Sequence, residues 1–209
     1  MMEKLKAVLA AHKSYQTAVN KDDLSKASSD AQLPDAEVFV NESTGALIII
    51  LPERHDSQDN QVQGGAEAVA KHVMTLPNVK IAVEEPITYN GTLLSNVGWT
   101  ANVMEKPQSK ALFAFEASSQ GSISHQIYVK QVGGMAISTS RYAAEKMPRD
   151  PKRYGNPEIN KTIAEKLIAN TSKAGDISVF PVGPDHLKIS YDRNTLSAHL
   201  KKAGWKMLD

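Results

Sequence analysis

An unbroken apolar run that gives way at once to polar and charged residues constrains the fold of this chain more than any other stretch. Residues 46–51 read Ala-Leu-Ile-Ile-Ile-Leu, and they are followed directly by Pro52, Glu53, Arg54, His55 and Asp56. A short apolar run that stops at a proline is typical of a strand buried on both faces, as in a parallel sheet. Ligands of open α/β sheets bind at the carboxyl ends of the strands. The run therefore predicts an α/β fold with a polar site just after residue 51.

Glu53 and His55 are two residues apart, so in an extended backbone their side chains leave the chain on the same side. A carboxylate and an imidazole held together can share proton transfer or supply two metal ligands. An isolated Glu-x-His after a strand is more often only a polar loop. The choice between these interpretations depends on the rest of the chain.

The composition is that of one ordinary globular domain. The 209 residues are 41% hydrophobic and 22% charged, which is enough chain to bury a sizeable core. The formal net charge of +1 argues against non-specific nucleic-acid binding, and no apolar run approaches the roughly 20 residues that span a bilayer. The lack of cysteine excludes disulfides, zinc–thiolate sites and thiol nucleophiles. We expect a soluble protein.

Predicted strands and helices alternate along the chain. Residues 1–35 are expected to form an N-terminal helix (3–19) and a polar connection, and residues 36–209 a single α/β domain. The pattern predicts strands at 37–40, 46–51, 79–83, 110–115 and 176–182, and helices at 61–76, 157–170 and 194–202. Turn-forming residues at 41–45 predict a hairpin at the sheet edge. The alternation predicts a central, mainly parallel sheet flanked by helices.

Two further predicted strands also end in residues that can carry chemistry. The strand at 79–83 runs into Glu84-Glu85-Pro86, and the strand at 176–182 runs into Gly183-Pro-Asp-His186. The carboxyl ends of parallel strands share one edge of a sheet. Of the paired glutamates we choose Glu85, because strand alternation places it on the same face as Val83. The predicted site therefore consists of Glu53, His55, Glu85 and His186.

This order of motifs resembles the superfamily that groups erythromycin-esterase-like enzymes, ChaN-like haem-binding proteins and TIKI/TraB proteins. Its members carry Gly-Glu-x-His or Gly-x-x-His after a first strand, a glutamate after a second, and Gly-x-x-His before a helix that ends in Leu-x-x-x-Gly. The matching residues lie within roughly 45–205 and are Glu53-x-His55, Glu84/Glu85, Gly183-x-x-His186 and Leu200-x-x-x-Gly204. The chain departs from the family pattern at two places. Pro52 replaces the usual glycine, and Ile159 or Asn160 stands where TraB-like members begin the penultimate helix with arginine, a role open to Arg141 or Arg153.

The resemblance implies a fold of the erythromycin-esterase-like and ChaN-like type. It does not imply a single activity, because the groups of this superfamily differ in what they do. TIKI members look like metal-dependent peptidases that use these glutamate and histidine positions. Erythromycin-esterase-like members hydrolyse a lactone with a histidine general base and no established need for metal. ChaN-like members bind haem, and related domains occur inside large bacterial toxins. A hydrolase of an amide or ester, acting on a small molecule or a peptide, is our first expectation. The alternative is a non-catalytic module that binds haem or a protein, either ChaN-like or a toxin or effector domain. A degenerate family member is a third possibility. The resemblance also implies a protein that is cytoplasmic or delivered as part of a secreted toxin or effector.

The predicted roles depend on whether a metal takes part. With a divalent ion such as manganese, cobalt or zinc, the ligands would be Glu53, His55 and His186, which would activate a water. Without metal, His55 would accept a proton from water while Glu53 or Glu85 orients its ring. His186 would then polarise the carbonyl or stabilise the oxyanion.

Two more residues are candidates for substrate binding. Arg54 is suited to an anionic group of a substrate, although a surface pair with Asp56 explains it equally well. His125 follows a serine-rich stretch that we expect to be a loop at the sheet rim, where binding residues are common. His12 and His199 lie on the terminal helices, where surface or packing roles are expected.

Overall fold

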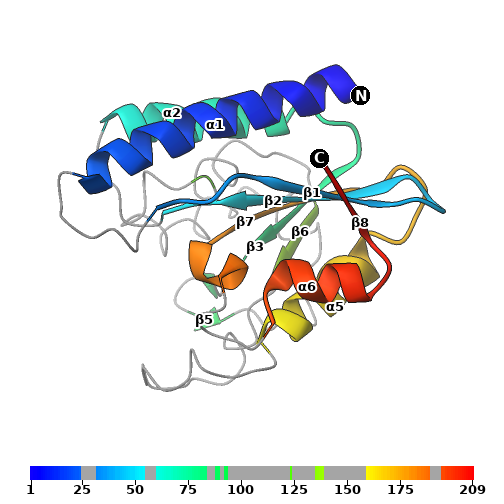
Figure 1. Cartoon of the computed structure of the whole chain (residues 1–209). Helices are drawn as coiled ribbons and strands as arrows, with labels where there is room; N and C mark the ends of the chain where they lie inside the picture. The colour runs from blue at the N-terminus through cyan, green and yellow to red at the C-terminus, as the bar shows by residue number, and fades with distance from the viewer. Residues whose placement is uncertain are drawn as a thin grey trace.

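The structure is a computed structural model, and it describes residues 1–24, 32–54, 60–83, 88–89, 92–93, 123, 135–138, 159–188 and 194–209. These residues form an α/β fold in which helices cover both faces of a mixed sheet (Figure 1). The predicted α/β class is confirmed, with a sheet that is partly parallel. Among the described helices, none combines the length with the apolar character that a membrane span needs.

The main sheet has the strand order β6-β3-β7-β2-β1-β8 in the described part of the chain. Its strands are β1 (Glu37–Asn41), β2 (Ala46–Pro52), β3 (Val79–Val83), β6 (Met135–Ser138), β7 (Ile177–Val182) and β8 (Lys206–Leu208). The four strands from β6 to β2 run parallel, while β1 is antiparallel to both β2 and β8. A separate pair, β4 (Thr88–Tyr89) and β5 (Thr92–Leu93), is antiparallel.

The apolar run in β2 is buried along its whole length because helices cover it from both sides. Side chains at 47, 49 and 51 pack with α1 (Met2–Leu24) and α2 (Asn60–Val73). Those at 46, 48 and 50 pack with α5 (Ile159–Asn170) and α6 (Leu196–Lys202). Each fully buried Leu or Ile side chain contributes about 1.5–3 kcal/mol. The β2 strand therefore joins both halves of the core.

The predicted hairpin at 37–51 is confirmed, but it does not lie at the sheet edge. The strands pair from Glu37 with Ile50 to Asn41 with Ala46, and Gly45 adopts a φ of 69° that favours glycine. The C-terminal residues 206–208 then add to β1 as an outer strand. Trp205, buried against α5 and α6, anchors this segment. The sequence predicted no strand after 176–182, so β8 is an additional strand that the structure reveals.

Other predicted elements differ mainly in their ends. The first helix continues to Leu24, into the region expected to be a polar connection. The chain returns to this helix at Leu33, whose backbone N–H donates to Asn20 Oδ1 at 2.8 Å and whose carbonyl accepts from Gln16 Nε2 at 2.8 Å. The second helix ends at Val73 rather than residue 76. The strand predicted at 110–115 falls outside the described residues.

Candidate active site at the carboxyl ends of β2 and β7

Glu53 and His186 follow two strands that are neighbours in the sheet. The β2 strand pairs with β7 in parallel, from Leu47 opposite Ile177 to Pro52 opposite Val182. The backbone N–H of Glu53 donates to the carbonyl of Val182 at 2.9 Å, which extends this pairing beyond β2. After β7, Gly183 leads into the short 3-10 helix η6 (Pro184–Leu187), which carries His186. The two residues therefore belong to the same edge of the sheet.

Both side chains are withdrawn from water. Glu53 is 0% exposed and His186 is 3% exposed. Burial of a carboxylate or an imidazole costs free energy unless hydrogen bonds replace the lost water. Buried ionisable side chains at the carboxyl edge of an α/β sheet are candidates for a functional site.

Asn160 fixes the orientation and the tautomer of His186. The Asn160 Nδ2 group donates to the carbonyl of Asn194 at 3.1 Å, so its Oδ1 atom must be the one that faces His186. His186 Nδ1 lies 2.6 Å from this oxygen. Because an amide oxygen only accepts, Nδ1 carries the hydrogen and the neutral ring has its lone pair on Nε2. Nε2 is then the nitrogen suited to accept a proton or bind a metal.

The same asparagine joins three segments around the site. Asn160 is fully buried in the first turn of α5, and Asn194 lies just before the start of α6. The α6 helix is capped by Thr195, whose side-chain oxygen accepts from the backbone N–H of Ala198 at 3.1 Å. The turn that carries His186 is thus tied to both helices on this face of the sheet.

Two side chains of α1 hold the backbone around Glu53. His12 Nε2 lies 2.8 Å from the carbonyl oxygen of Pro52, and since a carbonyl only accepts, Nε2 is the donor. The hydroxyl of Tyr15 accepts from the backbone N–H of Arg54 at 2.9 Å. Burial lowers the pKa of His12 and outweighs the hydrogen bond to Pro52, which raises it.

His12, Tyr15 and Asn160 were not among the residues that the sequence assigns to the site. A surface or packing role was expected for His12, and the residue is buried, but its contact beside Glu53 was missed. Its position on the apolar stripe of α1 was an available signal, because a buried imidazole must find a hydrogen-bond partner. Asn160 stands near the arginine position of the TraB-like pattern, and no local pattern predicts its contact with His186.

The other predicted site residues are placed only in part. The residues outside the described part of the chain are His55, Glu84, Glu85 and His125. Arg54 is half-buried, and Asp56, its alternative surface partner, is not described. Among the described residues, no three histidine, aspartate or glutamate side chains form a possible metal site. Two of the three predicted metal ligands, Glu53 and His186, share the sheet edge, and His55 is the third.

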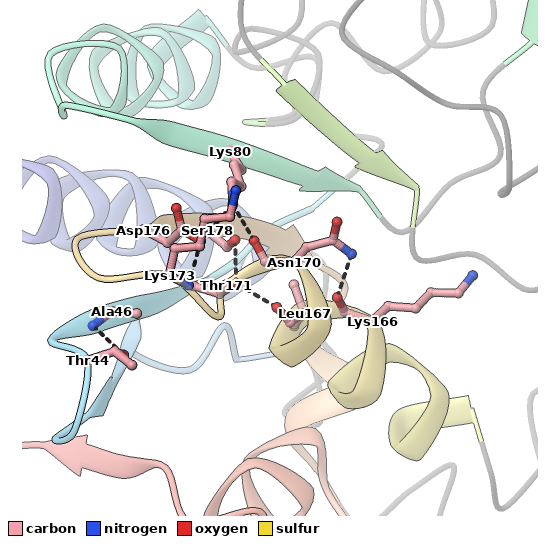
Figure 2. Close-up of polar contacts among 10 residues, drawn as sticks. All are labelled: Thr44, Ala46, Lys80, Lys166, Leu167, Asn170, Thr171, Lys173, Asp176 and Ser178. Carbon is pink, nitrogen blue, oxygen red and sulfur yellow. Dashed lines mark hydrogen bonds and ion pairs between the residues drawn. The ribbon is translucent and has the colours of Figure 1, made fainter.

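A second buried polar cluster lies at the opposite edge, where β3 and β7 begin (Figure 2). Lys80 Nζ forms an ion pair with Asp176 Oδ2 at 2.8 Å and donates to the carbonyl of Asn170. The hydroxyl groups of Thr171 and Ser178 lie 2.6 Å apart. Burial raises the pKa of Asp176, but hydrogen bonds from Lys80 and from the backbone N–H of Lys173 outweigh it and lower the pKa below 3.8. These groups satisfy one another, which fits a structural role.

Comparison with known proteins adds no assignment to this geometry. No protein-family model, curated protein or solved structure matches the chain. Kinship with erythromycin-esterase-like, ChaN-like and TIKI/TraB proteins therefore stays a prediction that depends on the motif residues. The class that the fold defines is an α/β protein with buried Glu and His side chains at the carboxyl edge of its parallel strands.

Proposed function

We propose that this protein is a hydrolase that cleaves an amide or ester bond at the carboxyl ends of β2 and β7, in the manner of TIKI or erythromycin-esterase-like proteins. One observation carries the proposal: Glu53 and His186 are both buried and follow adjacent parallel strands. A carboxylate and an oriented imidazole at one edge of a sheet are the groups that general-base hydrolysis requires.

In the metal-free form of the reaction, His186 Nε2 accepts a proton from water as the water oxygen attacks the carbonyl carbon. The carbon–oxygen or carbon–nitrogen bond then breaks, and the leaving group takes the proton back from Nε2. The Glu53 carboxylate stabilises the transient imidazolium. The hydrogen bond from Nδ1 to Asn160 favours this proton-accepting role, because the neutral ring has no second N–H to offer a carbonyl. The sequence suggests His55 as the base and His186 as the group that polarises the carbonyl or stabilises the oxyanion. We assign the base to His186 instead because of its Nδ1 hydrogen bond, and His55, outside the described residues, is the alternative base.

The donor set also suits a divalent metal. A carboxylate oxygen of Glu53 and Nε2 of His186 are ordinary ligands for manganese, cobalt or zinc, with His55 as the proposed third ligand. Such an ion would supply Lewis acidity toward the carbonyl oxygen and lower the pKa of a bound water. Arg54, next to Glu53 in the chain, and His125 are the proposed contacts to a small-molecule or peptide substrate.

Hydrolysis assays on matched variants test the proposal. The purified protein is assayed with a panel of aryl esters, lactones and fluorogenic peptides, with added manganese, cobalt or zinc and with a chelator. Glu53→Gln preserves shape, and His186→Asn preserves a donor to Asn160 while it removes Nε2. We expect each variant to lose about 100-fold or more in turnover. The matched control is His199→Asn, which changes a half-buried histidine of α6. This variant should retain activity.

The same samples separate the competing functions. Loss of turnover with the chelator, restored by one ion, favours the metal-dependent form. Haem titration distinguishes the ChaN-like alternative: a Soret band that disappears in His186→Asn, together with no hydrolysis of any substrate, would replace our proposal with haem binding.

A further inference from the structure

We propose that α1 is the positioning element of the candidate site, because His12 and Tyr15 hold the two peptide groups on either side of Glu53. The effect of this positioning on catalysis rests on the proposed function. The contacts themselves belong to the fold and can be tested without a substrate.

The first peptide group, between Pro52 and Glu53, is held at both of its polar atoms. Its carbonyl oxygen accepts from His12 Nε2 at 2.8 Å, and its N–H donates to the carbonyl of Val182 at 2.9 Å. One bond comes from α1 and the other from β7. This peptide plane is therefore fixed between a helix and the sheet.

The second peptide group, between Glu53 and Arg54, is held by the same helix. Its N–H donates to the Tyr15 hydroxyl at 2.9 Å. Two rigid peptide planes meet at the Cα atom of Glu53, so fixing both planes sets φ and ψ there. These angles determine the direction of the bond from Cα to Cβ, and with it the place of the buried carboxylate.

The position of α1 is itself determined by close packing. A Cβ atom on Gly65 of α2 would lie 3.1 Å from Tyr15 Cα and 3.2 Å from Tyr15 Cβ, so the two helices approach closely here and a larger residue would require them to shift. Tyr15 is fully buried, and so are Val8 and Val19 on the same side of α1. The helix therefore has little freedom to move relative to α2.

Core packing alone does not explain these contacts. A buried histidine or tyrosine is satisfied by any nearby carbonyl or N–H group. Here two side chains three residues apart, on one face of a helix, both reach the segment 52–54, about 40 positions along the chain. Their targets are the two peptide groups that flank a single buried carboxylate.

Amide hydrogen exchange at Arg54 tests the contact directly. Tyr15→Phe removes the acceptor, and the Arg54 N–H should exchange roughly tenfold faster than in the wild type. Val19→Ala is the matched control, because it weakens the packing of α1 and its side chain has no polar atom that could hydrogen-bond to residues 52–54. Exchange at Arg54 that is no faster in Tyr15→Phe than in Val19→Ala would overturn the proposal.

Kinetics test the positioning role. His12→Ala and Tyr15→Phe should each lower kcat by roughly tenfold with little change in KM. His12→Gln restores an N–H donor near the place of Nε2 and should recover kcat, and Val19→Ala should retain it. Normal kcat in His12→Ala and Tyr15→Phe, with Glu53→Gln inactive, would overturn the positioning role and leave the hydrolase intact. If the Arg54 N–H exchanges faster in Tyr15→Phe but the wild type hydrolyses no substrate, the positioning of residues 52–54 by α1 is supported and the hydrolase is contradicted.

Discussion

His186 Nδ1 and Asn160 Oδ1 lie 2.6 Å apart in the protein interior, although the residues are 26 positions apart in the chain. The amide group of Asn160 also reaches Asn194, so one buried side chain connects the turn after β7 with both helices on that face. The orientation of His186 is thus a property of the packed helices rather than of the turn alone.

Removal of the hydrogen bond between His186 and Asn160 should destabilise the fold and allow the His186 ring to adopt either tautomer. Asn160→Leu leaves a buried N–H of His186 without its acceptor, so the free energy of unfolding should fall by about 1–3 kcal/mol. Nitrogen NMR of the neutral imidazole should show the hydrogen on Nδ1 in the wild type. In the variant it should show a mixture of the Nδ1–H and Nε2–H tautomers. An unchanged tautomer would show that Asn160 does not control His186.

The two neighbouring glycines of α2 should respond to alanine in opposite ways. Gly65→Ala places a methyl group against the backbone of Tyr15, and we expect a loss of about 1–3 kcal/mol in the free energy of unfolding. Gly64→Ala meets no atom within 4 Å and should gain about 0.5–1 kcal/mol from higher helix propensity. Urea unfolding of both variants measures the difference, and equal effects would contradict the close approach of α1 and α2.

The ion pair at the opposite edge should stabilise the fold without affecting turnover. The side chains of Lys80 and Asp176 are only 15% and 11% exposed, so Lys80→Met should cost about 3 kcal/mol by leaving a buried carboxylate without its charged partner. The exposed pair of Lys6 and Glu3 is the control, and its loss should leave the urea midpoint unchanged. The lowered pKa of Asp176 makes its contribution present above pH 3.8 and lost as the pH falls further. A kcat in Lys80→Met well below that of the wild type would contradict a purely structural role.

His12 should make the fold sensitive to mild acid. Burial holds its pKa below the ordinary value of 6.5, so below that pH the unfolded chain binds a proton that the folded chain resists. The free energy of unfolding should therefore decrease as the pH falls from about 6.5 toward the lower folded pKa. Urea midpoints of the wild type and His12→Gln, compared between about pH 7 and pH 5, should diverge as the pH falls. Parallel curves would show that His12 is not buried as a neutral imidazole.

The sequence predicted those parts of the fold that have a local pattern. Six consecutive apolar residues indicated that β2 is covered on both faces, and turn residues at 41–45 indicated the hairpin. Two strand ends indicated that Glu53 and His186 share an edge, and the pairing of β2 with β7 gives the neighbouring strands that this requires.

The remaining features depend on contacts between distant residues. The β8 strand has only three residues and no apolar period, and its position depends on Trp205 in the core. The β7 strand lies between β2 and β3 although it comes long after both. His12 and Tyr15 could be recognised as buried from the apolar face of the first helix, but a periodic pattern reports that a residue is covered and not which atom it meets. For Asn160 the sequence contains no such signal.

A double-mutant cycle on turnover tests most directly whether Glu53 and His186 form one catalytic site. The assay compares Glu53→Gln, His186→Asn and the combined variant on the best substrate of the hydrolysis panel. Residues that act as a unit show strongly non-additive losses, so we predict a double variant that is about as slow as the slower single variant. Losses that multiply, or turnover that survives in either single variant, would contradict a shared site at the carboxyl ends of β2 and β7.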